Sequence, residues 1–145
     1  MMRTSQATAE WNGGLKDGSG TFAAGSKAFE GPYSFGTRFG EDTGTNPEEL
    51  IAAALAACFS MALSADLERA GTPSRQIRTT AHCILDQVDG KPTVTRIRLE
   101  TSGQVPGIDE ARFREAAEAA KKNCPVSRAL ASSIQVELEA RHEGS

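Results

Sequence analysis

The stretch GTNPEELIAAALAACFSMAL, residues 44–63, determines how the rest of the chain is organised. Asn46 fits the N-cap of a helix, and Pro47 fits its first position, where a missing N–H costs nothing. The pattern predicts a long helix that ends at Gly71, because glycine is the usual residue just past a helix. This helix is apolar nearly all round through Leu63, so most of its sides must be covered. A chain of this size covers such a helix more easily as a dimer.

Length and composition indicate a single domain over residues 1–145. Hydrophobic residues make up 39% of the chain and charged residues 24%, which are ordinary values for a soluble globular protein. The net charge is −3 and the 16 lysines and arginines are scattered along the chain. Such a chain lacks the basic field that nucleic acid or an anionic membrane would need. The sequence therefore predicts no nucleic-acid partner.

Signals for export, membrane insertion and metal binding are all missing from the sequence pattern. The first ten residues, MMRTSQATAE, contain no apolar stretch of the kind that a signal peptide needs. The apolar window at residues 50–65 is shorter than the ~20 residues that span a bilayer. The histidines and cysteines form no C-x-x-C or H-x-x-x-H spacing, which argues against a metal site. We expect a cytoplasmic protein with no metal and no place in a membrane.

Short strands and turns surround the long helix and predict an α+β fold. The expected elements are, in order, strands at residues 7–11 and 19–24, an ordered loop at 31–46 with room for a short strand, a hairpin over residues 77–99 with its turn at Asp89-Gly90, a helix from Asp109, a short helix opening at Cys124-Pro125, and a strand at 134–138. No repeat or linker interrupts this order.

Three cysteines make an odd number, and in a reducing compartment a persistent pair is more often catalytic or redox-sensing than structural. By its local sequence alone, Cys58 is a small apolar residue on a buried helix, since mid-helix placement supplies no positive charge to a thiolate. Cys124 differs, because as the N-cap of the helix opening at Pro125 it would lie at the positive end of a helix dipole. Cys83 is expected to be an inert core residue of a strand, and His82, on the other face, to be solvated.

Arg38 is the best candidate for a cation that could reach a cysteine from elsewhere in the fold. It stands in FGTRFG between Phe35 and Phe39, whose rings could hold the guanidinium. Glu48 could hold the same guanidinium through a two-pronged ion pair. The local sequence leaves simpler readings open for both residues: a solvated loop arginine, and an acid that stabilises a helix N-terminus.

Three segments together resemble the OsmC/Ohr family of thiol peroxidases, and its OsmC branch in particular. GTNPEELIAAALAACFSMAL, with Cys58 ten residues after Glu48, is similar to the signature helix of that family. KKNCPVSRAL, which contains Cys124, is similar to the motif of the second cysteine, and PYSFGTRF to the segment that bears the arginine. The resemblance implies an intertwined α+β homodimer in which long central helices pack against antiparallel sheets.

The resemblance also implies an activity and a role for each residue. Cys58 would be the peroxidatic thiolate that reduces organic hydroperoxides, and Cys124 the resolving cysteine that forms a disulfide with it. Arg38 and Glu48 would activate Cys58. The family uses no metal, haem or flavin, so the reductant would be an external dithiol such as a dihydrolipoyl group. The aromatic surroundings favour organic hydroperoxides and point to a substrate pocket formed by Phe35, Phe39 and Phe59.

Two other classes of function remain open for the same residues. The two cysteines could report peroxide to a partner as a redox sensor without turnover, although the chain has no DNA-binding motif. The protein could also be a ligand-binding or structural dimer with an inert Cys58. Helix geometry adds an expectation about assembly: ten residues of straight helix separate Glu48 from Cys58 by ~15 Å. We therefore expect the Glu48 that serves one Cys58 to come from the partner subunit.

Overall fold

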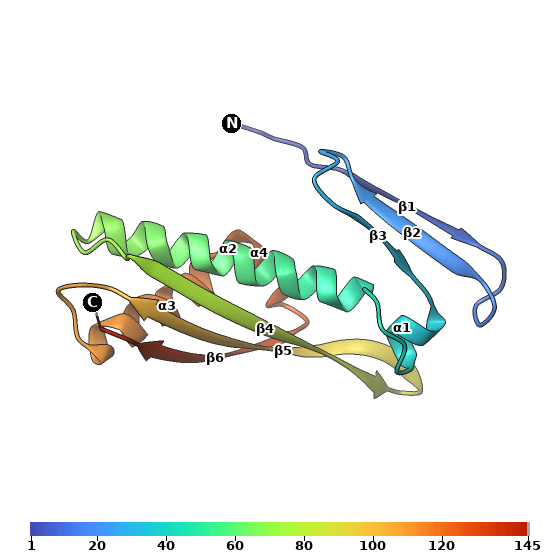
Figure 1. Cartoon of the computed structure of the whole chain (residues 1–145). Coiled ribbons are helices and arrows are strands. Elements are labelled where there is room, and N and C mark those ends of the chain that lie inside the picture. The colour runs from blue at the N-terminus through green and yellow to red at the C-terminus, as the bar shows by residue number, and fades with distance from the viewer. Residues whose placement is uncertain (145) are drawn as a thin grey trace. The chain divides into compact units, whose positions relative to one another are not determined.

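The computed structural model describes residues 1–144, which form two compact units, Met1–Leu50 and the chain from Ile51 onward. Figure 1 follows the chain from β1 to β6. The expectation of one domain over the whole chain stays a prediction.

The first unit is built on a three-stranded antiparallel sheet in the order β1-β2-β3. Its strands are β1 (Ala7–Asn12), β2 (Ser19–Ala24) and β3 (Glu30–Tyr33). The first two were expected from the alternating sequence. The segment 31–46 was expected to be an ordered loop with room for a short strand. It does hold the end of β3, but it also holds a short helix that was not expected, α1 (Phe35–Phe39).

One face of this sheet is aromatic, because residues opposite one another in the register share a face. The ring of Trp11 lies 5.5 Å from that of Tyr33, and the ring of Phe22 lies 6.0 Å from Tyr33. Gly20 leaves room for this cluster. A Cβ at that position would lie 2.6 Å from atoms of both Trp11 and Tyr33. The sequence SGTFAA thus forms a strand that lets two large rings meet across it.

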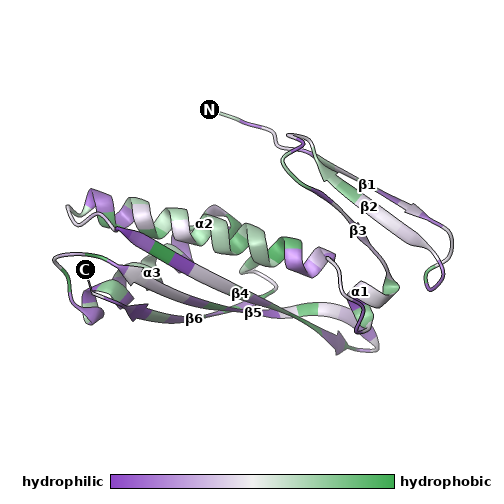
Figure 2. Ribbon diagram, viewed as in Figure 1, coloured by the Kyte–Doolittle hydropathy of each residue, from purple (hydrophilic) through white to green (hydrophobic). Residues whose placement is uncertain are grey.

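The long helix is confirmed as α2 (Pro47–Arg69). Asn46 is its N-cap, since the backbone N–H of Glu49 donates to Asn46 Oδ1 at 2.9 Å. A stripe at every fourth position is fully buried: Leu55, Phe59, Leu63 and Leu67. Figure 2 shows that the helix is hydrophobic along much of its length, well beyond one stripe. Within the described residues, α2 is the one helix long and apolar enough to cross a membrane, and 22% of its most apolar window is buried.

The second unit pairs three strands in the order β4-β5-β6, with bounds Gln76–Val88, Lys91–Gln104 and Gln135–His142. Asp89 and Gly90 have φ of 52° and 75°, the left-handed values of the tight hairpin turn that Asp-Gly predicts. β6 runs parallel to β5, so this sheet is not wholly antiparallel. The reason lies in the connection: α3 (Glu110–Asn123) and α4 (Pro125–Leu130) form a long crossover of the kind that parallel pairing requires.

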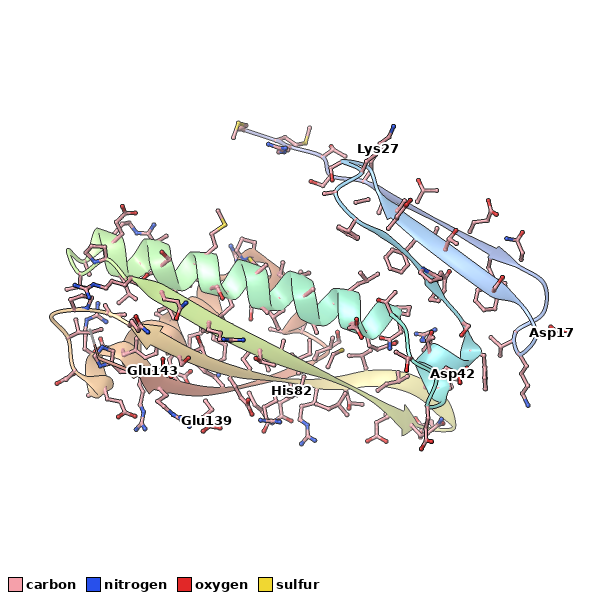
Figure 3. All side chains as sticks on the ribbon, viewed as in Figure 1. Asp17, Lys27, Asp42, His82, Glu139 and Glu143 are labelled. Atoms are coloured by element: carbon pink, nitrogen blue, oxygen red, sulfur yellow. The ribbon has the colours of Figure 1, made fainter. Side chains whose placement is uncertain are left out.

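The two faces of this sheet differ sharply. The outer face is polar, and His82 and Glu139 lie on it (Figure 3). The inner face joins α2 and α3 in the core, whose fully buried large side chains are Leu55, Phe59, Leu63, Leu67, Ile97, Leu99, Val105, Phe113 and Cys124. A short chain of hydroxyl groups also lies on the inner side: Ser60 Oγ donates to Thr79 Oγ1 at 2.7 Å, and Thr79 meets Thr101 at 3.0 Å.

Gly103, on the inner face of β5, lies where any larger residue should destabilise the fold. A Cβ there would lie 2.5 Å from Cε1 of Phe113, whose side chain is fully buried. Gly103→Ala should lower the free energy of unfolding by about 1–3 kcal/mol, the usual cost of overpacking a core. Denaturant unfolding at a fixed protein concentration measures this. Ser102→Ala, one residue earlier on the outer face, is the control, and equal midpoints for the two variants would contradict the expectation.

Candidate functional site

Cys58 lies on α2 beside the buried stripe of that helix. It is partly buried and packs against the hydrophobic core of the second unit. Its immediate neighbour Phe59 belongs to the stripe and is fully buried. The side chain of Cys58 is therefore held between the core and the surface, which is where a nucleophile must lie if a reagent is to reach it.

Cys124 occupies the junction between α3 and α4. It is the C-cap of α3, where its backbone N–H donates to the carbonyl of Ala120 at 2.9 Å, and it is also the N-cap of α4. Pro125 occupies the start of α4, as the sequence predicted. The side chain of Cys124 is fully buried. Two helix ends thus fix a thiol inside the core.

Cys58 and Cys124 are both free thiols, and their side chains adjoin at the edge of the core. Burial raises the pKa of Cys124, and the neighbouring thiol of Cys58 raises that pKa further. The backbone N–H groups of Ser127 and Val126, in the first turn of α4, lower the same pKa without closing a regular capping bond. The thiolate stabilisation that the sequence predicted at this helix start is thus present, but the net direction is upward because desolvation is the largest effect.

Arg38 and Glu48 form a tight ion pair within the first unit. Arg38 Nη2 donates to Glu48 Oε1 at 2.8 Å, and Arg38 Nε donates to Oε1 and Oε2 at 3.1 and 3.3 Å. The Glu48 side chain is 9% exposed and that of Arg38 is 38% exposed. The carboxylate is thus buried behind the guanidinium, which keeps one side open to solvent. The guanidinium also lies over the ring of Phe39, 5.2 Å from its centre.

A hollow of about 250 Å³ opens beside this ion pair. Phe35, Arg38 and Phe39 line it. The rings of the two phenylalanines lie 5.1 Å apart, centre to centre. Trp11 and Tyr33, which the sequence did not single out, complete the aromatic wall. Phe59 is not part of this hollow, since it is buried in the core of the second unit.

Cys83 and His82 lie on opposite faces of β4. Cys83 is partly buried on the inner face of β4 and packs against the core. His82 lies on the outer face, with Nε2 3.5 Å from a carboxylate oxygen of Glu100. Among residues 1–144, no group of three or more His, Cys, Asp or Glu side chains is arranged to hold a metal ion.

Sequence reasoning missed the residues that fix Arg38 in place. Ser34 and Thr37 form a reciprocal capping box around α1: the N–H of Thr37 donates to Ser34 Oγ at 3.2 Å, and the N–H of Ser34 donates to Thr37 Oγ1 at 2.9 Å. The Ser-x-x-Thr spacing was a signal for such a cap, but glycines on both sides of it favoured a loop. Asn46 was recognised as a cap, yet its side-chain amide also donates to the carbonyl of Thr37 at 2.9 Å.

Two adjoining thiols, and an arginine paired with a buried glutamate carboxylate, are groups of the kind that thiol-based redox proteins use. Residues 40–139 match the family model described as OsmC-like protein. The chain belongs to the OsmC family.

Individual relatives agree with this assignment. The chain is 46% identical over 132 residues to the protein named peroxiredoxin OsmC from Escherichia coli (strain K12), covering 90% of this chain and 92% of that protein. It is 32% identical over 98 residues to organic hydroperoxide resistance protein OhrB from Bacillus subtilis (strain 168), covering 67% of this chain and 70% of that protein. An organic hydroperoxide resistance protein from Elizabethkingia anophelis has a similar crystal structure, with a TM-score of 0.79, 27% identity and 99% of each chain covered.

Proposed function

We propose that this protein is a thiol-dependent peroxidase that reduces organic hydroperoxides to alcohols. The observation that carries the proposal is the contact between the Cys58 and Cys124 side chains, because a peroxidatic thiol needs a second thiol within reach to close its cycle. Membership of the OsmC family and the names of the relatives support the same class of reaction.

The first step is attack of the Cys58 thiolate on the distal oxygen of ROOH. The O–O bond breaks, the sulfur becomes a sulfenic acid, and the departing alkoxide takes a proton and leaves as the alcohol. Cys58 is the better candidate for this step, because it is partly exposed whereas Cys124 is fully buried. The more accessible sulfur therefore meets the hydroperoxide.

The second step is attack of Cys124 on the sulfenic sulfur of Cys58, which releases water and leaves a Cys58–Cys124 disulfide. An external dithiol then reduces that disulfide through a mixed-disulfide exchange, and a dihydrolipoyl group is our candidate for it. Because burial raises the pKa of Cys124, only a small fraction of this thiol is ionised near neutral pH. Formation of the disulfide should therefore become faster as the pH rises toward the pKa of Cys124.

Arg38 and Glu48 are the groups that we assign to activation. The guanidinium would stabilise the Cys58 thiolate and donate hydrogen bonds to the departing oxygen, while Glu48 fixes its orientation. The aromatic hollow beside Arg38 would receive the organic part of the hydroperoxide, with Phe35 and Phe39 as its contacts. Phe59 has no place in this proposed pocket because it is buried in the core.

We propose that the working form is a homodimer. Met61 on α2 is 77% exposed and several alanines of the same helix are exposed too, and an exposed apolar helix surface of this kind marks an interface. Glu48 and Cys58 are ten residues apart on α2, a separation of ~15 Å along a straight helix. The Glu48 that serves a given Cys58 would then come from the partner subunit, and an isolated monomer would be a poor peroxidase.

We place the protein in the cytoplasm, because a reducing compartment keeps cysteine thiols from forming lasting disulfides.

Cys124→Ser separates the two steps and tests the proposed cycle. The variant should consume about one equivalent of cumene hydroperoxide and then stop, because its sulfenic acid at Cys58 has no resolving thiol. The wild type should continue while a dithiol such as dihydrolipoamide is supplied. Measuring hydroperoxide loss with and without the dithiol gives the comparison. Dithiol-dependent turnover of Cys124→Ser at the wild-type rate would remove Cys124 from the cycle.

A redox sensor is the second candidate, because it would use the same contact between thiols. In that case the wild type would also stop after one equivalent, whichever dithiol is offered. Continued turnover excludes this candidate.

A further inference from the structure

The helix that carries Arg38 is too short to be stable alone. α1 has five residues, whereas isolated helices shorter than ~12–15 residues are marginal in water. The capping box of Ser34 and Thr37 fixes its start. Its last carbonyl groups have no partners within the helix and need donors from elsewhere. The position of Arg38 therefore depends on contacts that the rest of the first unit makes with α1.

Asn46 makes one of these contacts, and its side chain also caps the N-terminus of α2. Its Nδ2 donates to the carbonyl of Thr37 at 2.9 Å, directly before Arg38 in the chain. Its Oδ1 accepts from the backbone N–H of Glu49 at 2.9 Å, directly after Glu48. One side-chain amide thus joins the helix that carries the arginine to the start of the helix that carries the glutamate.

The chemistry of this bridge suits asparagine in particular. The carbonyl of Thr37 is an acceptor and the N–H of Glu49 is a donor, so the amide has one favourable orientation. A flipped amide would place its oxygen against the carbonyl and its NH₂ against the N–H. Serine and aspartate are good helix caps as well, but neither of them carries a donor and an acceptor in this planar arrangement. The intervening loop is tightly folded: a Cβ at Gly44, whose φ is 153°, would lie 2.7 Å from Thr37 Cγ2.

We propose that Asn46 is a positioning residue that sets the geometry of the Arg38–Glu48 ion pair. It acts through Arg38 and does not touch the reacting atoms. The proposal rests on the proposed function, in which that ion pair activates Cys58. It assigns to Asn46 a task beyond capping α2.

The test uses two variants that keep the cap and remove the donor. Asn46→Ser is neutral, and Asn46→Asp keeps the shape of the side chain, so the second variant serves if the first does not fold. Each should slow cumene hydroperoxide reduction about tenfold, with an unfolding midpoint close to that of the wild type. Asp109→Ser, at the N-cap of α3, is the matched control, because Asp109 accepts from the N–H of Arg112 in an equivalent cap. The control should keep the wild-type rate.

A double-mutant cycle distinguishes positioning from a general structural role. In an Arg38→Gln background, Asn46→Ser should slow the reaction less than twofold, since the group that it positions is gone. A tenfold loss in both backgrounds, or a rate within twofold of wild type in the single variant, would overturn the proposal. If Arg38→Gln alone keeps the wild-type rate, the activation part of the proposed function fails together with this inference.

Discussion

Cys58→Ser should abolish hydroperoxide reduction, with a loss of roughly 10³-fold or more, because the thiolate is the nucleophile and a serine hydroxyl is not ionised near neutral pH. The substitution is nearly isosteric at a partly buried position, so the fold should persist. The measurement is the loss of cumene or tert-butyl hydroperoxide in the presence of a dithiol. Circular dichroism of the same sample checks that the helices remain.

Cys83→Ser is the matched control for this experiment, because Cys83 is also partly buried and packs against the same core. It should keep the wild-type rate. If Cys58→Ser turns over like the wild type, or if Cys83→Ser loses activity to the same extent, the assignment of the peroxidatic cysteine is wrong.

Arg38→Gln should lower the second-order rate constant for hydroperoxide reduction by about 10²- to 10³-fold, the usual loss when a positioned electrostatic donor is removed. The substitution keeps a polar side chain but removes the positive charge and the two-pronged contact with Glu48. Stopped-flow measurement under single-turnover conditions isolates this step from the later reduction of the disulfide.

Glu48→Gln should have a smaller effect, roughly tenfold, because the guanidinium remains charged but is held less firmly. The matched control is Glu49→Gln, the same change of charge at the next position, whose side chain is exposed. We expect Glu49→Gln to react like the wild type. An Arg38→Gln variant within threefold of the wild type would show that the ion pair has a purely structural role.

Local signals in the sequence predicted α2 and the β4–β5 hairpin well. Asn46 and Pro47 mark the start of the helix, and Gly71, with a φ of 84°, follows its end as expected of a glycine stop. Asp89-Gly90 marks the hairpin turn for a similar reason. Each of these features depends on backbone preferences of two or three neighbouring residues, which a sequence states directly.

The features that the sequence did not reveal depend on contacts between distant segments. α1 lies in a glycine-rich segment and is held by Ser34, Thr37 and Asn46 together. The hollow beside Arg38 takes Trp11 from β1 and Tyr33 from the end of β3, two strands that are not adjacent in the sheet. No local sequence pattern predicts that these two side chains line the same hollow.

Cys124 illustrates the same limit in its electrostatics. The pair Cys124-Pro125 predicted a helix start, and a cysteine at a helix start is expected to have a stabilised thiolate. Burial raises the pKa of this thiol instead, and burial is a property of the completed core. The contact with Cys58, about which spacing alone says nothing, was expected only through the family resemblance.

Peptide mapping by mass spectrometry, after reduced protein has reacted with one equivalent of cumene hydroperoxide, tests the central claim most directly. The account predicts a loss of two hydrogen atoms from the chain and a linked peptide pair that contains Cys58 and Cys124, with Cys83 still reduced. A linkage that involves Cys83, or three unmodified cysteines after the hydroperoxide has been consumed, would contradict it.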